Sequence, residues 1–205
     1  MTRMLVLCRH GNTFNPGEKV VMVGANQDLA LTPVGKAQAL AVGQALIRLG
    51  LLPGQVITGP LQRTYEFAQI ISELIGGARA VRVDPRLTEI DYGAWGGLSD
   101  DEISQQWGEE ALHRWQTDGI RPDGVIFSPS AQQLEAEAQA LLRECIRFDG
   151  VTLVVTSNGR LREISRIIGG TPSKVRTGHI SVLTPNEQGG WKILRWDSAP
   201  ENFSG

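Results

Sequence analysis

Near the start of the chain, the apolar run of residues 4–8 is followed at once by Arg9 and His10. A continuous apolar run of this length is typical of a strand buried on both faces, as in a parallel sheet. Ligands of open α/β sheets bind just beyond the carboxyl ends of such strands, and Gly11 lets the backbone turn closely there. The sequence therefore predicts an anion site at this strand end, although these residues alone would also fit a solvated strand end.

Strand and helix patterns alternate along most of the chain, which predicts a mainly parallel sheet with helices on both faces. Thr32 is a favourable N-cap and Pro33 suits the first position of a helix, so a helix is expected from there to Gly50. Ser130 and Gln133 fit a capping box at the start of a later helix. The expected strands are 4–8, 55–58, 80–83, 152–156, 180–183 and 191–196, and the expected helices are 33–49, 61–75, 130–148 and 161–168.

This order of elements predicts a three-layer αβα sandwich in a single domain, residues 1–205, with one edge strand antiparallel. Residues 84–98 are rich in Gly and Asp, and residues 119–129 form a connection that contains Pro and Gly. We therefore expect residues 90–130 to form a lid-like insertion, with one or two short helices within 99–118.

Composition and charge exclude several functional classes. The net charge is −2 and no stretch of Lys and Arg forms a basic patch, so nucleic acid is not an expected partner. No apolar run approaches the ~20 residues of a membrane span, and the N-terminal run is too short for a signal peptide, which predicts a cytoplasmic protein. Cys8 and Cys145 are expected to be free core thiols, and the three histidines show no zinc spacing, so no metal site is predicted.

Two further strand ends carry unusual polar residues. Arg63 follows the expected strand 55–58 within a few residues, and Ser157, Asn158 and Gly159 directly follow the strand 152–156. The carboxyl ends of parallel strands lie on one edge of a sheet, so two arginines, a histidine and an amide are expected to converge there. This combination suits a phosphoryl group, because arginine binds two phosphoryl oxygens with its planar fork.

Four blocks of the sequence occur in the order expected of one known enzyme family. They are Arg9-His10-Gly11 with Thr13, then Asp28, Leu31-Thr32, Gly35 and Gln38-Ala39, then Leu61-Gln62-Arg63-Thr64, and finally Leu87-Thr88-Glu89 with Gly93, Trp95 and Gly96. Together they resemble the histidine phosphatase superfamily, which includes the cofactor-dependent phosphoglycerate mutases.

The resemblance implies that neutral His10 attacks phosphorus and forms a phosphohistidine. Arg9 and Arg63 would neutralise the non-bridging oxygens, and Glu89 would protonate the leaving oxygen and later deprotonate water. Neither a metal nor another cofactor is implied. The further phosphate-binding residues are Thr13, Asn15, Asn158 and Gly159, although Thr13 and Asn15 would equally suit the shaping of a turn.

The chain departs from the family at Asn158, which stands where the family carries a second histidine. Asparagine donates a hydrogen bond but carries no charge, which would slow phosphoryl transfer by about 10- to 100-fold. His179 is a candidate to replace the missing imidazole, with a loop or edge position as the alternative. Arg160 and Arg162 are expected to be solvated helix residues, with added positive charge at the site as the alternative.

The residues and the resemblance together predict a phosphatase that hydrolyses a small phosphomonoester. The modest length of the lid-like insertion favours hydrolysis, because a mutase must shield its phosphohistidine from water. Two alternatives stay open: phosphoglycerate-mutase-type phosphoryl transfer, and a catalytically weakened phosphoryl-binding protein. The expected partner is a small phosphorylated metabolite, whose identity the sequence does not indicate. A homodimer is one possible oligomeric state.

Overall fold

In the computed structural model, which describes residues 3–76, 80–171 and 174–202, a six-stranded sheet has the order β3-β2-β4-β1-β5-β6. The first four of these strands run parallel, β5 pairs antiparallel with β1, and β6 pairs antiparallel with β5. The mainly parallel sheet is confirmed, and its antiparallel part is the hairpin of the last two strands. The strands are β1 (Met4–Arg9), β2 (Pro53–Thr58), β3 (Val81–Val83), β4 (Val151–Thr156), β5 (Ile180–Pro185) and β6 (Trp191–Ser198).

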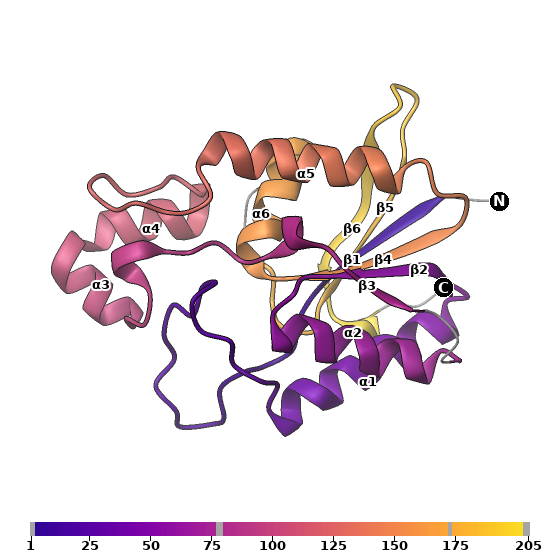
Figure 1. The fold of residues 1–205 in the computed structure, drawn as a ribbon, viewed down its shortest axis with the longest axis horizontal. Coiled ribbons are helices and arrows are strands. Elements are labelled where there is room, and N and C mark those ends of the chain that lie inside the picture. The colour runs from indigo at the N-terminus through magenta and orange to yellow at the C-terminus, as the bar shows by residue number, and fades with distance from the viewer. Residues whose placement is uncertain (1–2, 77–79, 172–173, 203–205) are drawn as a thin grey trace.

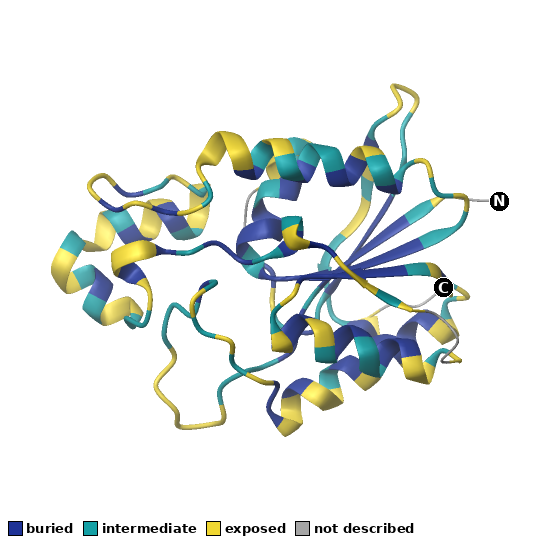
Figure 2. Ribbon diagram, viewed as in Figure 1, coloured by how far each residue is buried: buried dark blue, intermediate teal, exposed yellow. Residues whose placement is uncertain are grey.

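Helices cover both faces of the sheet and make the predicted three layers (Figure 1). On one face lie α1 (Pro33–Arg48) and α2 (Gln62–Leu74), and on the other lie α5 (Ala131–Cys145) and α6 (Asn158–Ile167). Alternate residues of β1 point into two separate cores, because successive side chains of a strand face opposite ways. Both faces of β1 are therefore buried, as its apolar sequence requires (Figure 2).

The connection between β3 and α5 projects beyond the carboxyl ends of the parallel strands (Figure 1). It holds an aromatic core of its own, in which Phe127 packs edge-to-face against Tyr92, Trp95 and Trp115. We call residues 90–130 the lid segment. Its regular elements, with the turn that precedes it, are η1 (Pro85–Leu87), η2 (Gly93–Trp95), α3 (Asp100–Trp107) and α4 (Glu109–Asp118).

Side-chain caps explain where two of the helices begin. Thr32 Oγ1 accepts from the Gly35 N–H at 3.1 Å, and Ser130 Oγ accepts from the Gln133 N–H at 3.1 Å, as their sequences predicted. Helix α6 differs, because it begins at Asn158 rather than near residue 161, and Ser157 makes no side-chain cap. Asn158 and Gly159 therefore lie in the first turn of a helix.

Cys8 and Cys145 are both buried free thiols, as expected, and burial raises the pKa of Cys145 to about 12. No helix in the described part of the chain is long and apolar enough to cross a bilayer.

Candidate active site

His10 lies directly after β1, buried, with its ring held in one orientation by the backbone. Its Nδ1 is 2.8 Å from the carbonyl oxygen of Gly11. A carbonyl only accepts hydrogen bonds, so Nδ1 carries the proton and Nε2 presents a free lone pair. Burial, followed by the charges of Arg9 and Arg63, holds the pKa of His10 well below its ordinary value of 6.5. The ring is therefore neutral and suited to nucleophilic attack.

Arg9 occupies the last position of β1, next to His10. Its Nη1 donates to the carbonyl of Val175 at 2.5 Å, whereas its Nε is buried and has no protein partner among the described residues. Burial lowers the pKa of this guanidinium, and the nearby carboxylate of Glu89 partly offsets the effect. A half-buried guanidinium whose Nε is buried and unpaired is well suited to an anionic ligand.

Arg63 lies in the first turn of α2 and is only 2% exposed. Its Nη1 donates to the carbonyl of Gln27 at 2.8 Å and its Nη2 to the carbonyl of Gly24 at 2.7 Å. Burial lowers the pKa of Arg63 as well, again opposed most strongly by Glu89. Arg9 and Arg63 both act on the pKa of His10, and Glu89 acts on both arginines, so the structure brings these four residues together from β1, α2 and the connection after β3.

Glu89 is buried, and backbone N–H groups bind both oxygens of its carboxylate. The N–H of Ile90 donates to Oε1 at 2.8 Å, and the N–H of Gly159 donates to Oε2 at 3.2 Å. Gly159 belongs to the first turn of α6, where unpaired N–H groups favour a negative charge. Glu89 therefore caps α6 from outside, which explains why this helix begins three residues before the predicted position.

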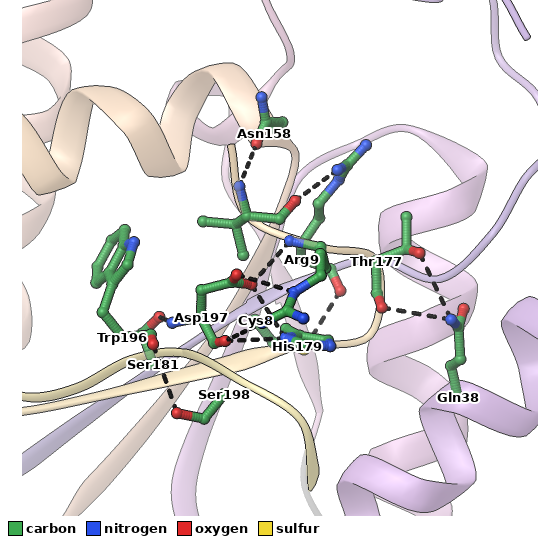
Figure 3. Close-up of polar contacts among 12 residues, drawn as sticks. Cys8, Arg9, Gln38, Asn158, Thr177, His179, Ser181, Trp196, Asp197 and Ser198 are labelled. Carbon is green, nitrogen blue, oxygen red and sulfur yellow. Dashed lines mark hydrogen bonds and ion pairs between the residues drawn. The ribbon is translucent and has the colours of Figure 1, made fainter. Parts of the chain in front are cut away.

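Asn158 contributes to a hydrogen-bond network behind the end of β1 (Figure 3). Its Oδ1 accepts from the N–H of Val175 at 2.9 Å, so the amide nitrogen is the donor left for a ligand. Gly159 leaves the space that Glu89 fills, since a Cβ on this glycine would lie 2.4 Å from Glu89 Oε1.

The two other predicted phosphate-binding residues lie on the loop after His10. The side-chain amide of Asn15 donates to Glu18 Oε1 at 3.0 Å, and its backbone N–H donates to Glu18 Oε2 at 2.7 Å, in an exposed turn. Thr13 is half-buried on the same loop. Contact of either residue with phosphate stays a prediction.

The ring of His179 contacts Asp197 on β6. Its Nδ1 lies 3.0 Å from the carbonyl oxygen of Asp197 and 3.1 Å from the Oδ1 of the same residue (Figure 3). These contacts fit the loop position that was the alternative to a role as replacement imidazole.

Arg160 and Arg162 are buried, so the prediction that they are solvated was wrong. Arg160 donates to the carbonyl of Thr88 and pairs with Glu137 at 2.6 Å. The guanidinium of Arg162 lies 4.9 Å from the ring centre of Trp115 and donates to the carbonyl of the same residue. Both arginines tie α6 to the connection that carries Glu89 and the lid segment, which periodicity alone does not indicate.

Sequence reasoning missed the buried hydroxyl of Thr58 at the same edge of the sheet, and it named Ser157 there without giving its hydroxyl a role. Thr58 Oγ1 at the end of β2 and Ser157 Oγ after β4 have no hydrogen-bond partner in the described structure, like Arg9 Nε. The signal was present, because both are polar residues that end an apolar strand. Strand β4 lies beside β1 and β2 lies beside β4, so both hydroxyls lie at the same edge of the sheet as His10.

A cavity of about 530 Å³ lies between the lid segment, α5 and α6, and its described lining includes none of His10, Arg9, Arg63 and Glu89. Ile90 and Gly159, which bind the Glu89 carboxylate, both line it, together with Arg121 and Arg162. No group of three or more His, Cys, Asp or Glu side chains in the described ranges is arranged to hold a metal ion.

Both the sequence and the fold match known proteins. The family model of the histidine phosphatase superfamily (branch 1) matches residues 5–199. A 2,3-bisphosphoglycerate-dependent phosphoglycerate mutase of Mesorhizobium japonicum is 31% identical over 174 residues, which cover 83% of each chain. A protein of the same description from Brucella ovis is 30% identical over 190 residues, or 90% of this chain and 91% of its own.

Solved structures of phosphatases share the fold. The native mycobacterial glucosyl-3-phosphoglycerate phosphatase aligns with a TM-score of 0.79 at 22% identity, over 96% of this chain and 99% of its own. A phosphoserine phosphatase of Entamoeba histolytica aligns with a TM-score of 0.71 at 23% identity, over 95% of this chain and 96% of its own. At these identities the likeness concerns the fold alone.

Proposed function

Because this chain belongs to the histidine phosphatase superfamily, we propose that it hydrolyses a small phosphomonoester through a phosphohistidine on His10. The observation that carries the proposal is the bond between His10 Nδ1 and the Gly11 carbonyl. This bond leaves Nε2 as a free nucleophile on a ring whose pKa is lowered by burial and by Arg9 and Arg63.

The proposed reaction has two steps. In the first, Nε2 of His10 forms a bond to phosphorus while the bond to the leaving oxygen breaks, and Glu89 gives that oxygen a proton. In the second, Glu89 takes a proton from water, the water oxygen bonds to phosphorus, and the phosphorus–nitrogen bond breaks. Arg9 and Arg63 stabilise the charge on the non-bridging oxygens in both steps.

Hydrolysis is favoured over mutase action by the modest size of the lid segment, since a mutase must protect its phosphohistidine from water. Mutase action is the second candidate, because the relatives at 30–31% identity carry that description.

The test is turnover of p-nitrophenyl phosphate whose phosphoryl group carries an isotopic label, so that the label marks the covalent intermediate. We expect label on His10 of the native protein and neither label nor turnover in His10→Ala. Incubation with 3-phosphoglycerate and 2,3-bisphosphoglycerate then separates the two candidates, because an isomerised product supports the mutase. Binding of inorganic phosphate without label or turnover would contradict both enzymes and support a binding protein.

A further inference from the structure

Residues 175–179, which we call the brace segment, lie beside the end of β1 that carries Arg9 and His10. The N–H of Arg9 donates to the carbonyl of His179 at 3.2 Å, and the N–H of Gly178 donates to the carbonyl of Arg9 at 3.1 Å. The Arg9 side chain adds a third contact, through Nη1 to the carbonyl of Val175 (Figure 3). The brace segment thus contacts both the backbone and the guanidinium of Arg9.

The two polar groups of Val175 are bound by different elements. Its carbonyl accepts from Arg9 at 2.5 Å, and its N–H donates to Oδ1 of Asn158 at 2.9 Å. Val175 is buried, so water does not readily replace either partner. We propose that Asn158 is a positioning residue, which aims the Arg9 guanidinium through the backbone of Val175. This inference rests on the proposed function, in which Arg9 binds the phosphoryl group.

The shape of the guanidinium explains why its aim matters. With Nη1 bound to Val175, the opposite edge, formed by Nε and Nη2, is the fork available for two phosphoryl oxygens. The Nε on this edge is the buried atom that has no protein partner in the described chain. Release of Nη1 would let the guanidinium rotate and misalign this fork.

Other contacts hold the rest of the brace segment without Asn158. Arg176 donates its N–H to Asp197 at 2.8 Å and its Nε at 3.1 Å, and Gln38 Nε2 donates to the carbonyl of Thr177 at 3.3 Å. Loss of the Asn158 side chain should therefore displace Val175 locally and leave the fold intact. A neutral residue in place of the family's histidine is sufficient for this role, since a backbone N–H needs only an acceptor.

A double-mutant cycle of Asn158→Leu and Arg9→Lys tests the proposal. Leucine has about the same size but no acceptor, and lysine keeps the charge of Arg9 but has no fork. The readouts are kcat/KM for p-nitrophenyl phosphate and the Kd of inorganic phosphate by calorimetry. In the protein that keeps Arg9, we expect Asn158→Leu to lower kcat/KM and the affinity for phosphate by about 10-fold each. In the Arg9→Lys background the same substitution should lower each by less than about 2-fold. Equal losses in both backgrounds would overturn the proposal, because Asn158 would then act independently of Arg9.

NMR of the arginine Nε–H group supplies a readout that needs no activity. The Arg9 Nε–H signal is assigned by its loss in Arg9→Lys. It should shift in Asn158→Leu and stay close to its native position in Asn158→Asp, which keeps an acceptor for Val175. An unchanged signal in Asn158→Leu would overturn the proposal.

Thermal unfolding checks that the variants are folded, and Asn158→Ser, which is too short to reach Val175, replaces the leucine variant if that one does not fold. Absence of turnover in every protein would contradict the proposed function alone, because the phosphate-binding cycle and the NMR signal still test the role of Asn158.

Discussion

The N–H of Gly159 donates to Oε2 of Glu89, and the α-carbon of the same glycine faces Oε1 so closely that a Cβ would lie 2.4 Å from it. Helix α6 and the candidate acid/base residue are therefore positioned by one contact. At the N-terminus of α6, the Glu89 carboxylate accepts the kind of hydrogen bond that the side chain of Ser157 does not accept. The helix N–H in turn holds the carboxylate in place.

This contact predicts the effect of Gly159→Ala. The new methyl group would also lie 2.7 Å from Ile90 Cδ1, so the Glu89 carboxylate must move. We expect kcat to fall by about 10- to 100-fold, because a displaced acid/base group misses the reacting oxygen. Gly190→Ala is the matched control, since its Cβ would meet only the flexible Asn186 side chain at 3.3 Å, and kcat should not change. Native kcat in Gly159→Ala would show that Glu89 is not the acid/base residue.

Arg63→Lys tests whether the second guanidinium is needed for its shape as well as its charge. Lysine cannot bind the carbonyls of Gly24 and Gln27 and a phosphoryl group together. We expect kcat/KM to fall by about 100-fold or more and the free energy of unfolding to fall by about 1–3 kcal/mol.

The control is Arg48→Lys at the C-terminal end of α1, which removes a hydrogen bond to the carbonyl of Pro200. It should leave kcat/KM at the native value, whereas equal losses in both variants would indicate a general effect on folding.

The lowered pKa of His10 predicts a pH dependence of stability. Below pH 6.5 the unfolded chain binds a proton at His10 that the folded chain excludes, so the free energy of unfolding decreases as the pH falls. The contribution is at most about 1.4 kcal/mol per pH unit. His10→Gln removes it, so urea unfolding of this variant should depend less on pH between 7.5 and 5.0 than that of the native protein.

His113→Gln is the control for that experiment, because His113 is exposed on α4 and lies outside the site. In this variant the free energy of unfolding should change with pH as it does in the native protein. A native slope in His10→Gln would show that the folded protein does not exclude the proton at this position.

Phe127→Ala should disrupt the lid segment. The ring centre of Phe127 lies 5.2 Å from that of Tyr92, 5.6 Å from Trp95 and 5.0 Å from Trp115. We expect the free energy of unfolding to fall by about 3–5 kcal/mol. Tryptophan fluorescence should shift to the red as Trp95 and Trp115 become hydrated. Phe127→Leu, which fills most of the space, should lose less than half as much. Identical losses would mean that aromatic packing does not stabilise the lid segment.

Local sequence was sufficient to predict most of the elements. The apolar run before Arg9 predicted β1, and Thr32 and Ser130 predicted the starts of α1 and α5, because a strand's burial pattern and a helix cap depend on neighbouring residues. The parallel arrangement followed from the alternation of strands and helices. It correctly brought His10, Arg9, Arg63 and the turn after β4 to one edge of the sheet.

Only the tertiary structure decided how those side chains are held. Glu89, on the connection after β3, accepts a hydrogen bond from the first turn of α6. Asn158 Oδ1 accepts from the N–H of Val175, and the buried Arg160 forms an ion pair with Glu137. Each of these partners is far away in the sequence, so no periodicity or cap signal encodes the pairing. The sequence by itself determined which chemical groups meet, since strand order and chain direction place them. Their orientation depended on hydrogen bonds that exist only once the layers have packed and excluded water.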